Sequence, residues 1–148
     1  MKKRILLKKI NSLVESSEKR DELLKEVVAL LKNNFSHYNW VGIYLMEGEE
    51  LVLGPYLGKP SPHTRITLDK GVCGAAAKQK KTIIVSDVTK DSRYLACSPE
   101  TQSEIVVPIM KNNEPVGEID VDSDAKDAFK KNDKAILERV SSILSGLF

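Results

Sequence analysis

The sequence carries little that would commit the chain to nucleic acid, to a membrane or to the cell exterior. Its 148 residues hold 23 basic and 21 acidic side chains, and the formal charge of +2 gives no argument for nucleic-acid binding. The apolar run after the basic N-terminus, residues 5–7, is far shorter than the roughly 7–15 residues of a signal-peptide core. No run approaches the roughly 18 apolar residues of a membrane helix. We therefore expect a cytoplasmic protein with neither a nucleic-acid nor a membrane partner.

Cysteine and histidine are also scarce, with two of each. No Cys-x-x-Cys pair occurs, and His37 and His63 stand apart, so we expect no metal centre. In a reducing compartment, two cysteines are more often free or catalytic than a structural disulfide. Cys73 lies between glycines that favour the start of a helix, where the pKa of a thiol falls, and His63 could assist a thiolate. The alternative is that Cys73 and Cys97 are inert, buried hydrophobic residues.

What the sequence does contain is clear hydrophobic periodicity, helical at both ends of the chain and alternating between them. The predicted helices cover residues 6–14, 23–35, 71–79 and 132–147. The predicted strands cover residues 40–46, 51–56, 65–68, 82–85, 103–110 and 115–122. Short turns join strands 40–46 and 51–56, and also strands 103–110 and 115–122, so each pair is expected to form a hairpin.

This order of elements predicts a single α/β domain of the α+β type, spanning residues 1–148. Hairpins imply an antiparallel sheet. Helices at the two chain ends can pack together on one face of that sheet. The opposite face is then left for the mixed middle segment, and a sheet covered by loops and a short helix is a suitable place for a ligand pocket.

Two sets of side chains stand out because each shares one face of its strand. Alternation in the strand at residues 40–46 puts Trp40 and Tyr44 on the face away from the terminal helices, although packing alone also explains aromatic residues in a strand. The last strand puts Glu118, Asp120 and Asp122 on one face, and aspartate is uncommon in strands. These acids form either a solvated edge face or a wall that binds a cation or donates a proton. Glu104 would join them if its strand pairs with the last one.

Eight segments of the chain share a pattern with a known family, and they are residues 39–44, 51–56, 58–59, 71–74, 86–88, 96–97, 103–108 and 117–123. Taken in order, from Asn39 to Ser123, they resemble the GAF-domain enzymes that reduce free methionine-(R)-sulfoxide. The resemblance is specific, because a generic GAF domain has neither the two cysteines nor the acidic set.

The resemblance implies an enzyme whose substrate is the free amino acid. Cys97 matches the nucleophile, which becomes a sulfenic acid, and Cys73 matches a cysteine that resolves it as a disulfide, although the two roles could be exchanged. A thioredoxin-like dithiol would then reduce the disulfide without any bound cofactor. Trp40 and Tyr44 match an aromatic wall around the substrate.

Three of the acidic residues also match the family, whereas a fourth, Glu118, does not. Glu104, Asp120 and Asp122 match the acids that bind the sulfoxide oxygen and the ammonium group, whereas Glu118 stands where the family pattern is usually apolar. Many members also carry a third cysteine in the loop at residues 60–65, and this chain has none there. That departure leaves a non-catalytic GAF module that binds an amino-acid-like ligand as the alternative. The terminal helices could also pair between two chains as a homodimer.

Overall fold

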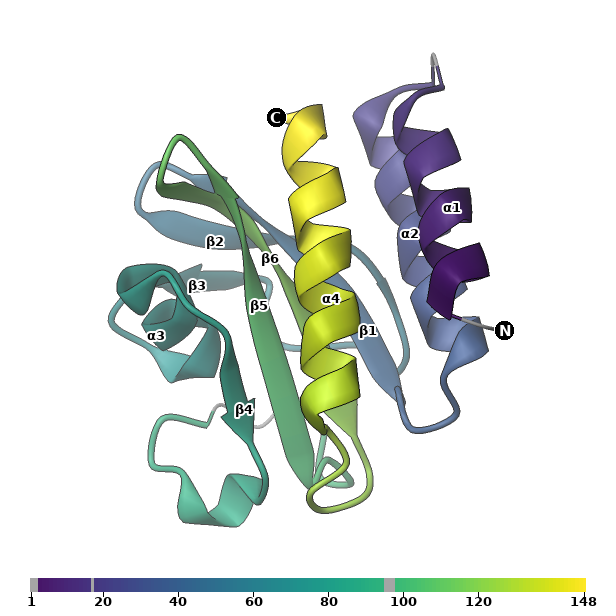
Figure 1. Cartoon of the computed structure of the whole chain (residues 1–148). Coiled ribbons are helices and arrows are strands. Elements are labelled where there is room, and N and C mark those ends of the chain that lie inside the picture. The colour runs from purple at the N-terminus through teal and green to yellow at the C-terminus, as the bar shows by residue number, and fades with distance from the viewer. Residues whose placement is uncertain (1–2, 17, 95–97) are drawn as a thin grey trace.

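The computed structural model describes residues 3–16, 18–94 and 98–148, and these form one antiparallel sheet of six strands with helices on both faces (Figure 1). The strand order is β3-β2-β1-β6-β5-β4. The strands are β1 (Trp40–Glu47), β2 (Glu50–Leu57), β3 (Arg65–Thr67), β4 (Ile83–Val85), β5 (Ser103–Lys111) and β6 (Glu114–Ser123). The predicted α+β architecture is confirmed.

Tight turns explain why the two long hairpins form where the sequence predicts them. Asn112 and Asn113, between β5 and β6, have φ values of +52° and +64°. Two consecutive residues with positive φ are what a type I′ hairpin turn requires, and asparagine tolerates that region better than most residues. The β1–β2 turn contains Gly48, with a φ of +62°.

Three helices cover one face of the sheet (Figure 1). They are α1 (Lys3–Val14), α2 (Arg20–Asn34) and α4 (Lys131–Leu144), and a 3-10 turn, η2 (Ser145–Leu147), extends the last one. Their apolar stripes pack on alternate residues of the central strands, such as Val41, Ile43 and Val121, to form the main core. The chain ends therefore meet on one face, as the periodicity predicted. Among the described residues, no helix has the length and apolar character needed to cross a membrane.

The other face carries a smaller core under the middle segment. Here lie α3 (Gly71–Gln79) and a single 3-10 turn, η1 (Val88–Lys90). Ala76 and Ala77 of α3 pack with Tyr44, Ile66 and Val106 in this second cluster of buried residues. The short helix therefore lies directly over the face that holds the predicted acidic and aromatic residues.

Candidate active site

A row of buried acids runs along β6 under α3. Asp122 pairs with Trp40 of β1 and Glu104 of β5, and Asp120 pairs with Gly42 and Val106. Glu104 is 4% exposed, Asp120 and Asp122 are 1% exposed, and Glu118 is fully buried. The solvated-edge interpretation of these acids is therefore wrong, because β6 lies in the middle of the sheet and α3 covers its acidic face.

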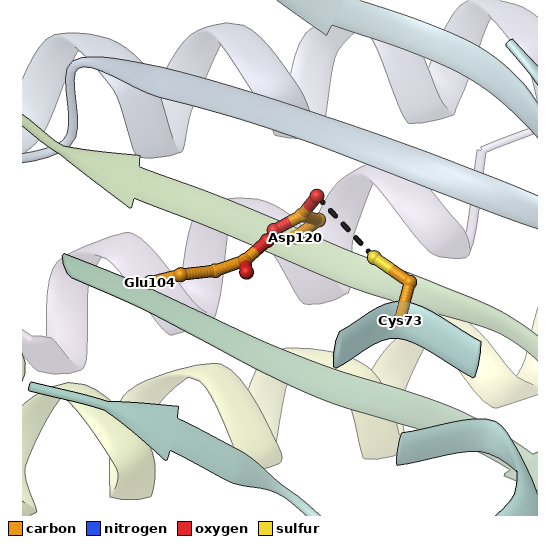
Figure 2. Close-up of side chains that lie close together, drawn as sticks. All are labelled: Cys73, Glu104 and Asp120. Carbon is orange, nitrogen blue, oxygen red and sulfur yellow. Dashed lines mark hydrogen bonds between the residues drawn. The ribbon is translucent and has the colours of Figure 1, made fainter. Parts of the chain in front are cut away.

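Cys73 belongs to α3, the helix that covers the acidic face, and it contacts this row of acids. It is the third residue of α3, and its thiol donates a hydrogen bond of 3.4 Å from Sγ to Asp120 Oδ2 (Figure 2). Glu104 approaches from β5, so that one ligand atom from each of Cys73, Glu104 and Asp120 lies within 4.8 Å of the other two. Segments far apart in sequence thus bring a thiol and two carboxyl groups together.

The thiol of Cys73 is held in its protonated form. Burial raises its pKa well above the ordinary value, and the neighbouring Asp120, Glu118 and Glu104 raise it further. The prediction that a helix start would lower this pKa is wrong. The amino end of α3 does lie at Cys73, but its partial positive charge is outweighed by desolvation and by three carboxyl groups.

The carboxyl groups also favour their neutral forms. Burial is the main cause that raises the pKa values of Glu118, Asp120 and Asp122, and repulsion from Asp120 adds to it for the other two. Contact with Glu104 opposes the rise at Asp120 and Asp122. Within the described residues, no donor forms a well-aligned hydrogen bond with either oxygen of Glu118 or Asp122, or with Oδ1 of Asp120. A cluster of this kind can supply a proton and can bind a cation.

The two predicted aromatic residues hold the loop before β3 against this face. Trp40 Nε1 donates to the carbonyl oxygen of Lys59 over 2.9 Å, and its ring stacks on Tyr56 with centroids 5.6 Å apart. Tyr44 donates from its hydroxyl to the carbonyl oxygen of His63 over 2.8 Å. Both aromatic residues therefore lie on the predicted face, and both are anchored by hydrogen bonds as well as by packing.

A small cavity lies at the meeting point of these elements. Its volume is about 10 Å³, room for about one water molecule. The cavity is lined by Tyr44, His63, Ile66, Gly71, Val72, Cys73, Glu104 and Asp120. Trp40 and Asp122 lie on the same face but are not part of the lining. Ile66 was not singled out from the sequence, and nothing in its local pattern distinguishes it from an ordinary buried strand residue.

Cys97, the predicted nucleophile, lies outside the described residues. In the sequence it falls between η1 and β5. Its partnership with Cys73 therefore stays a prediction.

Comparison with known proteins identifies the family. The family model for the GAF domain matches residues 19–146. The chain is 35% identical over 117 residues to the free methionine-R-sulfoxide reductase of Escherichia coli, covering 79% of this chain and 70% of the relative. The chain belongs to the free methionine-R-sulfoxide reductase family of GAF domains. The Saccharomyces cerevisiae member is 42% identical over 111 residues, covering 72% of this chain and 61% of that protein.

The family resemblance extends to the three-dimensional structure. A free methionine-R-sulfoxide reductase from Neisseria meningitidis, solved in complex with its substrate, superposes with a TM-score of 0.92. The two sequences are 34% identical, and the match covers 98% of this chain and 87% of the other. Members of the family are oxidoreductases, which agrees with the enzyme class expected from the sequence. The roles of the individual cysteines and acids in this chain stay predictions.

Proposed function

We propose that the protein reduces free methionine-(R)-sulfoxide to methionine, with Cys97 as the nucleophile and Cys73 as the resolving thiol. The observation that carries the proposal is the buried thiol of Cys73, 3.4 Å from Asp120, above a row of acids in a chain of this family. A generic ligand-binding module has no need of a thiol buried among carboxyl groups, and such burial has a stability cost.

The first step needs a proton at the sulfoxide oxygen. A carboxyl group kept neutral by burial, as in the row on β6, can donate that proton or a strong hydrogen bond. The Cys97 sulfur then attacks the sulfoxide sulfur, and the oxygen passes from the substrate to the cysteine. The products are methionine and a sulfenic acid at Cys97.

The second step uses Cys73. Its thiol condenses with the sulfenic acid, forming the Cys97–Cys73 disulfide and releasing one water molecule. The raised pKa of Cys73 suits this role, because a protonated thiol does not compete as the first nucleophile. The first step leaves the row of acids short of one proton, and Asp120, which already accepts a hydrogen bond from this thiol, is placed to take the thiol proton. A thioredoxin-like dithiol then reduces the disulfide by exchange, so no bound cofactor is needed.

Substrate recognition follows from the same residues. The carboxylates among Glu104, Asp120 and Asp122 would pair with the ammonium group, and Trp40 and Tyr44 would flank the side chain. A cavity of about 10 Å³ does not admit an amino acid, so binding requires the residues around it to move apart. A cytoplasmic location and a homodimer remain parts of this proposal.

The decisive experiment follows the mass and the free thiols of the reduced protein after free methionine-(R)-sulfoxide is added. The wild type should release one methionine per chain, lose about 2 Da and retain no free thiol. Cys97→Ser should release no methionine. Cys73→Ser should release one methionine and then stop, with a sulfenic acid trapped by a sulfenate-specific reagent.

The S epimer is the control for specificity, and a protein-bound methionine sulfoxide is the control for the free substrate. If Cys97→Ser kept the wild-type rate, the assignment of the nucleophile would be wrong. If the wild type bound the sulfoxide tightly with no change in thiols or mass, the chain would be a binding module.

A further inference from the structure

The group formed by Cys73, Glu104 and Asp120 has the composition of a metal site. A thiolate and two carboxylates carry three negative charges when ionised, and together they suit a borderline cation such as Zn²⁺ better than Mg²⁺ or Ca²⁺, which avoid sulfur. No sequence pattern indicates this group, because the three residues are dispersed and belong to no ligand motif. The fold brings them together from α3, β5 and β6 (Figure 2).

The distances fit such an ion. In a tetrahedral zinc site, with Zn–S near 2.3 Å and Zn–O near 2.0 Å, a sulfur and an oxygen ligand lie roughly 3.5 Å apart. The separation of Cys73 Sγ and Asp120 Oδ2 is 3.4 Å. The ligand atoms of all three residues lie within 4.8 Å of one another, so small side-chain rotations bring Glu104 to the same ion.

Two further observations point to a bound cation at this place. The cavity of about 10 Å³ is lined by all three residues, and it is large enough for an ion but too small for an organic ligand. Asp120 is 1% exposed, and no donor among the described residues forms a hydrogen bond with its Oδ1. A cation at this place would give that buried oxygen a partner once the carboxyl group has lost its proton.

We propose that Cys73, Glu104 and Asp120 form a binding site for one Zn²⁺ ion, with the fourth tetrahedral position left to water. On binding, the Cys73 thiol and any protonated carboxyl group release their protons to solvent, and no oxidation occurs. The ion is an inhibitor and not a cofactor. It holds the resolving thiol as a metal thiolate, and it takes the place of the substrate's ammonium group.

The inhibitory consequence rests on the proposed function, whereas the metal site itself does not. The two are separated by measuring binding directly. Cobalt(II) serves as the probe, because a cobalt–thiolate bond gives a near-ultraviolet charge-transfer band that a carboxylate or imidazole site lacks. The reduced, metal-free protein is titrated with CoCl₂, and ZnCl₂ is then added.

The expected result is a charge-transfer band that saturates at one cobalt per chain and disappears as zinc displaces the cobalt. Cys97→Ser should keep the band, and Cys73→Ser, a one-atom exchange, should abolish it. Asp120→Asn should weaken zinc binding at least about 10-fold, the lower end of what loss of even an outer-shell partner causes. Asp124→Asn, an exposed aspartate just beyond β6, is the matched control and should bind as the wild type does.

The proposal is overturned if no band forms, or if the band survives Cys73→Ser and is lost in Cys97→Ser. Circular dichroism establishes that each variant is folded, and if Asp120→Asn is not, the two cysteine variants still decide the question. Zinc should also inhibit sulfoxide reduction, and a chelator should restore it. A Cys73-dependent band in a protein that reduces no sulfoxide would support the site and refute the proposed function.

Discussion

At the scale of single residues, Glu118 is the least expected feature of the molecule. It is fully buried on β6 between Tyr44 and Pro108, and no described donor forms a well-aligned hydrogen bond with its oxygens. Burial and the nearby Asp120 raise its pKa well above the ordinary value. A buried carboxyl group must either keep its proton or carry a charge in a poor environment, and each choice makes the folded state sensitive to pH.

We expect Glu118→Gln to be more stable than the wild type above neutral pH, by about 1–3 kcal/mol. The folded pKa of Glu118 lies above the unfolded value near 4.3, so the folded state binds a proton that the unfolded state has lost. The stability of the wild type therefore falls as pH rises from the unfolded pKa through the folded one. Glutamine does not titrate, so its advantage should grow with pH.

Urea unfolding of both proteins between about pH 4.5 and 8.5 measures this difference. Exposed acids with lowered pKa values, such as Glu100 at about 2, change stability in the opposite direction, but they are the same in both proteins and cancel. Glu49→Gln, at an exposed turn, is the control and should differ from the wild type by a constant amount. A constant difference for Glu118→Gln as well would contradict the argument.

The sequence predicted which residues share a face, but not how buried they are. Alternation on β6 placed Glu118, Asp120 and Asp122 together, because the period of a strand depends only on the local backbone. Whether that face meets water depends on which strands flank β6 and on what covers it. Those contacts are non-local, and the same pattern is compatible with an exposed edge.

At the scale of elements, α3 is the part that positions Cys73, and its contact with the chain after β3 is unusually close. A Cβ atom at Gly74 would lie 2.8 Å from the carbonyl oxygen of Leu68 and 2.9 Å from that of Thr67. These are backbone atoms at the end of β3 and cannot rotate away. Glycine at this position therefore lets the helix lie directly against the strand end, which places Cys73 over Asp120.

We expect Gly74→Ala to destabilise the protein by about 1–3 kcal/mol, since the helix must move to relieve the overlap. The cost of the overlap outweighs the gain of about 1 kcal/mol that alanine gives over glycine within a helix. The shift of Cys73 should slow formation of the disulfide more than the first release of methionine. Rapid-quench measurement of the two steps, together with urea unfolding, tests both effects.

Gly146→Ala is the matched control for Gly74→Ala. The nearest atom to a Cβ at Gly146 is Val14 Cγ1 at 4.0 Å, so the methyl group fits without displacement. Its stability should equal or slightly exceed that of the wild type. If Gly74→Ala behaved like Gly146→Ala, the close contact of α3 would not fix the position of Cys73.

The short helix also shows where prediction from sequence ends at this scale. The segment at residues 71–79 was predicted as a helix and is confirmed, because alanine content and a glycine at its start are local signals. The direction of the pKa shift at Cys73 was predicted wrongly. It depends on carboxyl groups contributed by β5 and β6, which only the tertiary fold brings to the helix.

At the scale of the whole molecule, Asp133 connects two segments of the helical layer that are far apart in the sequence. Its Oδ1 accepts hydrogen bonds from His37 Nε2 and the Tyr38 hydroxyl, both over 2.8 Å. Its Oδ2 accepts a hydrogen bond of 2.9 Å from the backbone N–H of Lys130 at the start of α4. The segment between α2 and β1 is thereby joined to the last helix, on the face opposite the candidate site.

We expect Asp133→Asn to lower the free energy of unfolding by about 1.5–3 kcal/mol, the range for hydrogen bonds to a charged group. The amide can accept at only one atom, so either the buried Tyr38 hydroxyl or the backbone of Lys130 loses its partner. Glu22→Gln is the control, because it removes the same charge from an exposed pair with Lys25, and such pairs contribute little. Urea midpoints at constant m-value give the comparison.

The same variant separates stability from catalysis. None of the three residues that hydrogen-bond to Asp133 in the described chain lines the cavity, so folded Asp133→Asn should release methionine and form the disulfide at the wild-type rates. The variant unfolds at a lower temperature and a lower urea concentration than the wild type does. Its activity should fall only under the conditions in which it unfolds. A loss of rate in the fully folded variant would mean that the helical layer acts on the opposite face of the sheet, and that the two faces do not work independently.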